Sequence, residues 1–211
     1  MEVAFVENLI PRYTPEEAKS LRLHFDYEDE RRKMTPDEFW EFCARNRKIR
    51  AELTKEGDVI IMPPTGFETG DWNVEIIRQL GNWAKQDGSG ITTDSNAGYV
   101  LPSGATYAPD AAWTLRERLR DFSSEERSRF LRLCPDFVVE LRSPSDNPRR
   151  LLEKMNEWLE GGARLAWLVD PYKKQIHIYR PGREPEILEH PTRVSGEDVL
   201  PGFELDLTEI W

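Results

Sequence analysis

The run Leu165-Ala-Trp-Leu-Val-Asp170 constrains the fold of this chain more than any other segment, because five apolar residues follow one another without a polar break. A strand with one face in water alternates apolar and polar residues, whereas a strand covered on both faces does not. We therefore expect residues 165–170 to form a strand that is buried on both faces. The next segment, Gln175–Arg180, alternates, and this pattern is typical of a half-buried strand.

Helical patterns occur on both sides of the expected strands. Apolar side chains recur every three or four positions within residues 71–86, which predicts a helix. A second helix is expected over residues 147–160, with Asp146 as its cap and Gly161-Gly162 at its end. Further strands are expected at residues 98–101, 107–115 and 136–142, and a hairpin with Gly57 in its turn is expected at residues 49–62.

The N-terminal part of the chain has a different character. Residues 15–33 are polar and predict a helix, and Thr35 followed by Pro36 marks the start of another, because threonine caps helices and proline suits the first turn. We therefore divide the chain into an N-terminal helical extension, residues 1–48, and one domain, residues 49–211.

Composition narrows the function classes. The 211 residues include 32% charged residues and a formal net charge of -10, which argues against a general nucleic-acid coat protein because phosphate binding depends on Lys and Arg. Two distant cysteines favour neither a zinc site nor a disulfide framework. No apolar run is long enough to span a membrane, and the N-terminal stretch has no signal-peptide pattern. We expect a cytoplasmic protein with no membrane partner.

The chemistry is carried by two strand-like runs, residues 107–113 and 134–143, in each of which an acid follows a proline. If the strand ends match in an antiparallel pair, opposing residue numbers sum to about 250, and Asp110 faces Glu140 with Cβ atoms about 5 Å apart. Two such carboxylates could hold one divalent cation, with water in the remaining positions. A one-residue slip would place the acids on opposite faces. The pairing predicts a metal site suited to a phosphodiester.

Other side chains compete for places in this site. Asp136 shares a face with Glu140 but lies roughly 13 Å away along a strand, so it would support the start of the strand instead. Arg142, one pleat beyond Glu140, or Lys154 on the following helix would supply a cation; arginine is a poor general base because it stays protonated. Glu75 would add a third carboxylate, or is a solvated helix residue.

The two acids also have a purely structural interpretation. An aspartate after a proline often marks a turn, and a glutamate at a strand end often lies in water. However, Glu140 ends the apolar run Phe137-Val-Val139, and an unpaired charge buried there would be costly. A cation or Arg142 would neutralise it, which favours the metal-site interpretation.

At these residues the chain resembles the PD-(D/E)XK nuclease superfamily and, more closely, the Uma-two family of proposed bacterial endonucleases, classified as a domain of unknown function. The resemblance covers most of residues 45–211. It rests on Met62-Pro-Pro-Thr65, Ala108-Pro-Asp-Ala-Ala112, Pro135-Asp-Phe-Val-Val-Glu-Leu-Arg-Ser-Pro-Ser145, Lys154, Leu165-Ala-Trp-Leu-Val-Asp170 and Leu200-Pro-Gly-Phe203.

The resemblance implies an α/β, restriction endonuclease-like fold, in which a central mixed β-sheet is flanked by helices. It also implies Mg²⁺-dependent cleavage of DNA. The first acid of the superfamily maps to Asp110, the second to Glu140 and the helix acid to Glu75. Its lysine maps to Arg142, which is a departure; either Arg142 substitutes, or Lys154 does so from the next helix, or the site is inactive.

We expect a metal-dependent endonuclease that hydrolyses DNA phosphodiester bonds. Asp110 and Glu140 would bind Mg²⁺ or Mn²⁺, Arg142 or Lys154 would stabilise developing charge, and Glu75 would assist. A homodimer would allow two strands to be cut. The alternative is a nuclease fold that has lost catalysis and binds nucleic acid or protein, which the missing lysine and the acidic charge favour.

Overall fold

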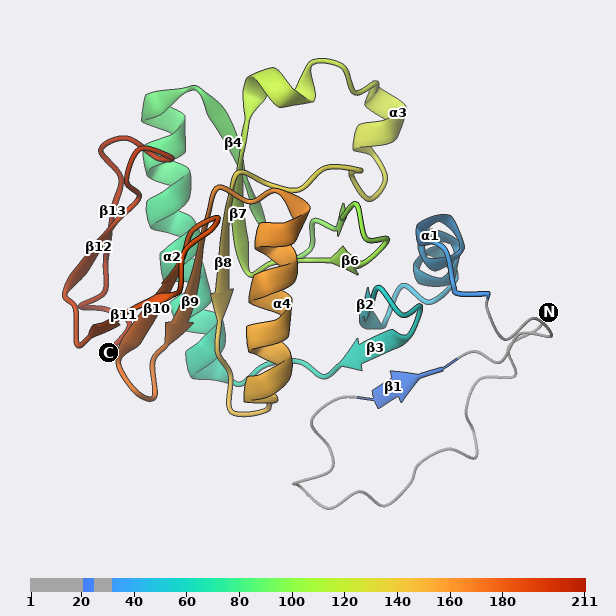
Figure 1. The fold of residues 1–211 in the computed structure, drawn as a ribbon, viewed down its shortest axis with the longest axis horizontal. Coiled ribbons are helices and arrows are strands. Elements are labelled where there is room, and N and C mark those ends of the chain that lie inside the picture. Colours follow the sequence, from blue (N-terminus) through green and yellow to red (C-terminus); the bar gives the residue numbers. More distant parts are fainter. Residues whose placement is uncertain (1–20, 25–31) are drawn as a thin grey trace.

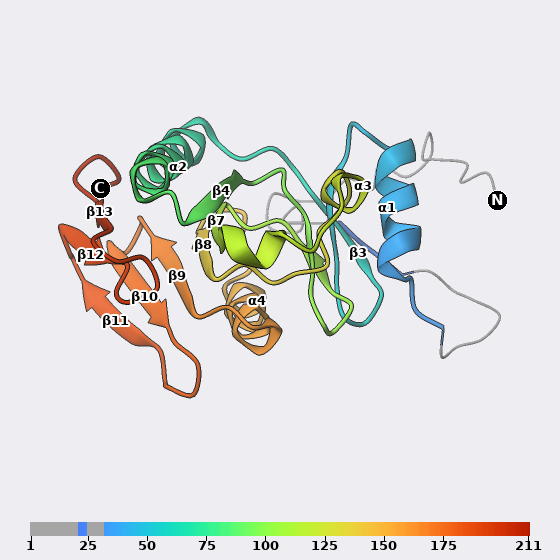
Figure 2. The same cartoon turned by 90° about the horizontal axis from the view of Figure 1, so that it is seen from above.

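The chain folds around a six-stranded sheet with one long helix on each face (Figure 1). The structure is a computed structural model and describes residues 21–24 and 32–211. The long helices are α2 (Phe67–Asp87) and α4 (Pro148–Gly161). Seen from above, they lie on opposite sides of the sheet (Figure 2), so the domain has three layers, helix, sheet and helix.

The central sheet is mixed, with strand order β11-β10-β9-β8-β7-β4. Strands β8 and β9 are parallel and α4 connects them, whereas the other neighbouring pairs are antiparallel. Its strands are β4 (Gly90–Asp94), β7 (Ala111–Leu115), β8 (Phe137–Leu141), β9 (Leu165–Asp170), β10 (Gln175–Tyr179) and β11 (Glu186–Glu189).

A second, smaller sheet lies beside the central one and has the order β1-β3-β2-β6-β5. Helix α1 (Pro36–Arg45) packs against it through Phe39 and Phe42, which form an apolar cluster with Leu53 and Val59. The strands of this sheet are β1 (Leu21–Leu23), β2 (Arg50–Leu53), β3 (Val59–Met62), β5 (Tyr99–Val100) and β6 (Thr106–Tyr107). The remaining elements are a 3₁₀ turn η1 (Arg116–Leu119), α3 (Ser124–Arg127), and the ribbon β12 (Arg193–Ser195) with β13 (Glu204–Asp206).

The core divides into two halves along the central sheet. On strand β9, Leu165, Trp167 and Val169 face the half that α2 covers, while Ala166 and Leu168 face the half that α4 covers. All six residues of β9 are buried. The prediction of a strand buried on both faces is therefore confirmed.

Several predicted elements are also confirmed. Strands β2 and β3 form the expected hairpin. Gly57 in its turn has φ +90°, a backbone conformation that residues other than glycine rarely adopt. Thr35 caps α1 in a capping box with Glu38. The cap of α4 is Asn147 rather than Asp146, because the Asn147 side chain accepts hydrogen bonds from the first backbone N–H groups of the helix.

Other predictions were wrong. Residues 21–23 were expected to be helical but form strand β1, because pairing with β3 outweighs local preference. Of the rest of the predicted 15–33 helix, the structure describes only residues 24, 32 and 33. The expected strand 107–115 is broken between β6 and β7, which belong to different sheets. Pro109 lies at the break and has no N–H to donate to a strand partner. Strand β4 was not predicted.

Nowhere in residues 21–24 and 32–211 does a helix combine the length and the apolar character needed to cross a membrane.

Gly90 tests how tightly the α2 side of the core is packed. A Cβ atom at Gly90 would lie 2.2 Å from Cε2 of Trp113, a ring that is 1% exposed and therefore has little room to move. We expect Gly90→Ala to lower the free energy of unfolding by about 1–3 kcal/mol in urea titrations. Gly81, inside α2, has open space around its Cβ position, so Gly81→Ala is the matched control and should raise stability by about 0.5–1 kcal/mol. Equal stability of the two variants would contradict this packing.

Candidate active site

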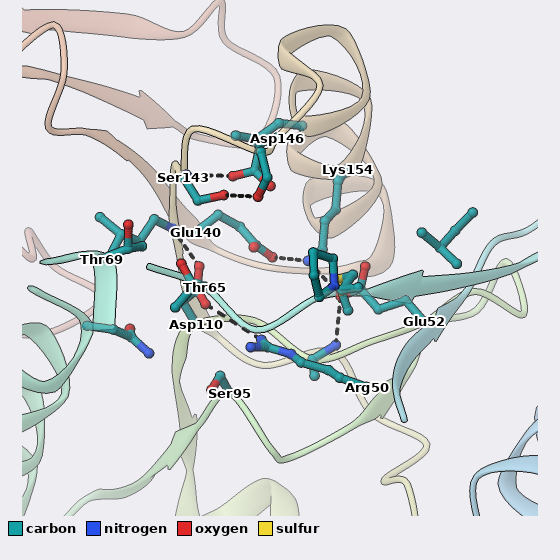
Figure 3. A pocket seen from close by; sticks show the side chains of 18 of the residues that line it. Arg50, Glu52, Thr65, Thr69, Ser95, Asp110, Glu140, Ser143, Asp146 and Lys154 are labelled. Atoms are coloured by element: carbon teal, nitrogen blue, oxygen red, sulfur yellow. Dashed lines mark hydrogen bonds and ion pairs between the residues drawn. The ribbon is translucent and has the colours of Figure 1, made fainter. Parts of the chain in front are cut away.

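A cavity of about 310 Å³ lies between the two sheets. Residues from β2, β3, α2, β8 and α4 line it, together with the segment before β7 and the loop between β8 and α4 (Figure 3). Its polar and charged lining includes Arg50, Glu52, Thr65, Thr69, Asn73, Ser95, Asp110, Glu140, Ser143, Ser145, Asp146, Asn147, Arg150 and Lys154.

The structure brings Asp110 and Glu140 together in the register that the sequence predicts. Ala111 pairs with Val139 and Ala112 with Val138, so opposing residue numbers sum to 250. Asp110 directly precedes β7, and by the same register it is the position that faces Glu140. Asp110 Oδ2 accepts a hydrogen bond of 2.8 Å from the backbone N–H of Leu141, which fixes the carboxylate at the edge of the cavity. Its side chain is 21% exposed.

Glu140 is more deeply buried, with its side chain 5% exposed. Its Oε1 accepts hydrogen bonds of 2.8 Å from Trp158 Nε1 and from Lys154 Nζ. Burial raises the pKa of Glu140 to about 8; Lys154 opposes this shift, whereas Asp110 and Glu52 add to it. Burial also raises the pKa of Asp110, whereas the Leu141 N–H, Lys154 and Arg50 lower it.

Lys154 is the cation of this cluster. Its ammonium lies 2.8 Å from Glu140 Oε1 and 2.8 Å from Glu52 Oε1, and 5.4 Å from the centre of the Tyr107 ring. Burial alone would lower the pKa of Lys154, but the carboxylates of Glu140 and Glu52 outweigh burial and raise it. Lys154 therefore remains protonated at neutral pH and acts as a fixed positive charge.

The structure does not bring Arg142 into the cavity. Its Nη1 lies 2.6 Å from Asp170 Oδ2, and its guanidinium lies 5.9 Å from the centre of the Tyr172 ring. The parallel register of β8 and β9 explains this position, because Glu140 pairs with Leu168 and residue 142 therefore lies level with Asp170. Lys154, not Arg142, is the cation beside Glu140.

Glu75 is also separate from the cavity. It bonds to Arg78 and Gln79 on its own helix and lines a different, polar cavity of about 490 Å³ near β13. The geometry of α2 explains the separation, because Thr69 and Asn73 face the first cavity and Glu75, two residues after Asn73, points about 200° away around the helix. Glu75 therefore does not supply a third carboxylate there.

Asp136 has the supporting role that was expected as the alternative. Its Oδ2 accepts a hydrogen bond of 2.9 Å from the backbone N–H of Leu115, and its Oδ1 lies 2.9 Å from Arg118. The buried Asp136 thus joins the start of β8 to the end of β7.

Several cavity residues were missed by the sequence analysis. Glu52 is the most important, because it is a buried acid that contacts Lys154 across 102 positions of sequence. Its only local signal is a charge between Ala51 and Leu53 in a predicted strand, which is equally typical of a solvated residue. Arg50, which lies 3.8 Å from Asp110, has no sequence pattern that marks it as a site residue.

Within residues 21–24 and 32–211, no group of three or more His, Cys, Asp or Glu side chains could hold a metal ion. Asp110 and Glu140 both line the cavity, and carboxylates are ligands that a divalent cation would accept there. Each carboxylate raises the free energy of the other when charged, and a cation between them would relieve that repulsion.

The Uma2 family model, described as "Putative restriction endonuclease", matches residues 36–208. The chain belongs to the Uma2 family. No curated protein matches it. Among solved structures, this Uma2 chain is similar to a protein from Anabaena variabilis that is described as a "putative nuclease belonging to DUF820". The TM-score is 0.70 at 19% identity, over 84% of this chain and 97% of the other. The predicted restriction endonuclease-like fold is confirmed, whereas the domain boundary at residues 48 and 49 stays a prediction.

The raised pKa of Glu140 predicts how stability depends on pH in metal-free protein. Between the ordinary value of 4.5 and about 8, the folded state holds a proton that the unfolded state releases. Stability from this group is therefore full below pH 4.5 and is lost as pH rises through 8. In chelator-treated samples, wild type should lose stability more steeply than Glu140→Gln, by at most about 1.4 kcal/mol per pH unit. Parallel profiles between about pH 4 and about pH 8.5, a range that includes both pKa values, would contradict this shift.

Proposed function

We propose that this Uma2 protein is a metal-dependent endonuclease that hydrolyses phosphodiester bonds of DNA. One observation carries the proposal: Asp110, Glu140 and Lys154 come from three separate elements and converge in a single cavity. Two carboxylates can hold a divalent cation, and a lysine ammonium can stabilise charge on a reacting phosphoryl group.

Asp110 and Glu140 would hold Mg²⁺ or Mn²⁺. Both cations prefer oxygen ligands, and Mg²⁺ is usually bound by one or two carboxylates with water and substrate phosphate in the other positions. When bound, the cation would polarise the scissile phosphate and lower the pKa of a bound water. The protein fixes one carboxylate through the Leu141 N–H and the other through the Trp158 indole, so both are oriented in advance.

Lys154 would stabilise charge at the reacting phosphate. Because it stays protonated, it serves as an electrostatic partner for negative charge and not as a general base. Its burial strengthens that effect, since charges interact more strongly where water is excluded. Arg50 and Arg150 also line the cavity and would add positive charge where the DNA backbone enters.

The alternative, an inactive nuclease fold that binds nucleic acid or protein, rested chiefly on the missing lysine two residues after Glu140. Lys154 can take the place of that lysine, because its ammonium lies 2.8 Å from Glu140. We therefore favour the enzyme over the binding module. A homodimer would allow both strands of a duplex to be cut and remains a proposal.

Substitution of the three central residues tests the enzyme. We expect Asp110→Asn, Glu140→Gln and Lys154→Met each to lower Mn²⁺-dependent cleavage of plasmid and single-stranded DNA by at least about 100-fold, because each removes a group that acts on developing charge. Calorimetry should show weaker Mn²⁺ binding in Asp110→Asn and Glu140→Gln.

Glu160→Gln is the matched control, because Glu160 lies on the same helix as Lys154 but is exposed and does not line the cavity. Its cleavage rate should equal that of wild type. Cleavage that survives in purified Asp110→Asn at the wild-type rate would exclude this site as the source of activity.

A further inference from the structure

The mechanism above uses one of the two carboxylates that contact Lys154 and leaves the other without a role. Glu140 would bind the metal cation, whereas Glu52 comes from β2 of the smaller sheet and has no part in the proposed chemistry. Figure 3 shows Lys154 between these two acids. The presence of a second buried carboxylate beside the Lys154 ammonium needs an explanation, because burying charge is costly unless each charge is well paired.

Glu52 joins three parts of the chain through one oxygen. Its side chain is 4% exposed, and its Oε1 accepts a hydrogen bond of 2.8 Å from Lys154 Nζ and one of 3.3 Å from the backbone N–H of Ala108. Ala108 lies two residues before Asp110. Glu52 therefore touches both the helix that carries the ammonium and the segment that carries the first acid.

The charge balance of the cluster shows why a second carboxylate matters. If Glu140 alone held Lys154, its negative charge would be shared between the ammonium and any bound cation, and the two positive charges would compete for it. Glu52 gives Lys154 a partner of its own. The lysine then keeps its position when Glu140 serves the cation.

We propose that Glu52 is a positioning residue for the nuclease reaction: it holds the Lys154 ammonium and the 108–110 segment in place, so that Glu140 is available to the cation and the substrate. This inference rests on the proposed function. It also makes the smaller sheet part of the active site, because β2 supplies the acid that completes the cluster.

A role for Glu52 as a third metal ligand fits the structure less well. Across the described ranges, no three acids lie close enough to hold one ion, and the ammonium of Lys154 contacts both Glu52 and Glu140. Glu52 therefore acts through Lys154 and not directly on a metal.

Glu52→Gln separates positioning from simple structural support. Glutamine keeps the size of the side chain and an acceptor oxygen, and it removes only the charge. We expect kcat to fall by about 10–100-fold with KM changed less than about threefold, since residues that orient active-site groups have effects of that size. In a Lys154→Met background the same substitution should cause no further loss of kcat, because glutamine can still accept from the Ala108 N–H and the charge that is removed acts only on Lys154. Additive losses in the double variant would overturn the proposal.

Chemical labelling tests the position of Lys154 without metal or activity. An amine-reactive ester, followed by peptide mass spectrometry, gives the labelling rate of each lysine. We expect Lys154 to react severalfold faster in Glu52→Gln than in wild type, because one of its two anchors is weakened. Glu160→Gln is the matched control: Glu160 is exposed on the same helix, so that variant should leave the labelling rate of Lys154 unchanged.

The two experiments distinguish failure of the positioning role from failure of the nuclease proposal. If wild type cleaves no DNA, the nuclease proposal fails, and the labelling rates still decide whether Glu52 positions Lys154. If wild type cleaves DNA, while Glu52→Gln matches it in kcat and in the labelling rate of Lys154, the positioning role is excluded. A fall in melting temperature alone, with both rates unchanged, would also overturn it.

Discussion

The buried ion pairs around Lys154 are the interaction on which the rest of the site depends. One ammonium, 14% exposed, is held by Glu52 and Glu140, with side chains 4% and 5% exposed, and Asp110 adds a third carboxylate nearby. The cluster has more negative than positive charge, and burial makes that imbalance costly. Burial, together with Asp110 and Glu52, raises the pKa of Glu140 against the opposing effect of Lys154. The metal cation of the proposed function would reduce this excess of negative charge.

The architecture explains how such a cluster can exist inside a stable protein. Helices α2 and α4 bury the two faces of the central sheet, so the apolar clusters on either side of β9 supply stability that does not depend on the charged residues. The charged cluster borders the apolar cluster on the α4 side, because Trp158 of that cluster donates to Glu140 and its Tyr107 ring lies beside Lys154. It lies where β2 and α4 approach the end of β8. The smaller sheet thus shields the charges from water and strengthens their interactions.

Much of this arrangement was predictable from local sequence patterns. The continuous apolar run of β9, the periodicity of α2 and α4 and the Asp110–Glu140 register all depend on contacts between segments whose own patterns show which face is buried. The partners of charged groups were not predictable in the same way. Glu52 and Lys154 are 102 positions apart, and Arg142 is held by Asp170 on a neighbouring strand, so only the tertiary structure shows which charges meet.

Anomalous diffraction from crystals grown with Mn²⁺ and without nucleic acid would test most directly whether Asp110 and Glu140 share one cation. We expect a single strong anomalous peak in the cavity, within about 2.0–2.6 Å of an oxygen from each carboxylate, with Lys154 still bonded to Glu52. A peak bound elsewhere, or no peak in the cavity at Mn²⁺ concentrations that occupy other sites, would contradict a two-carboxylate metal site in this protein.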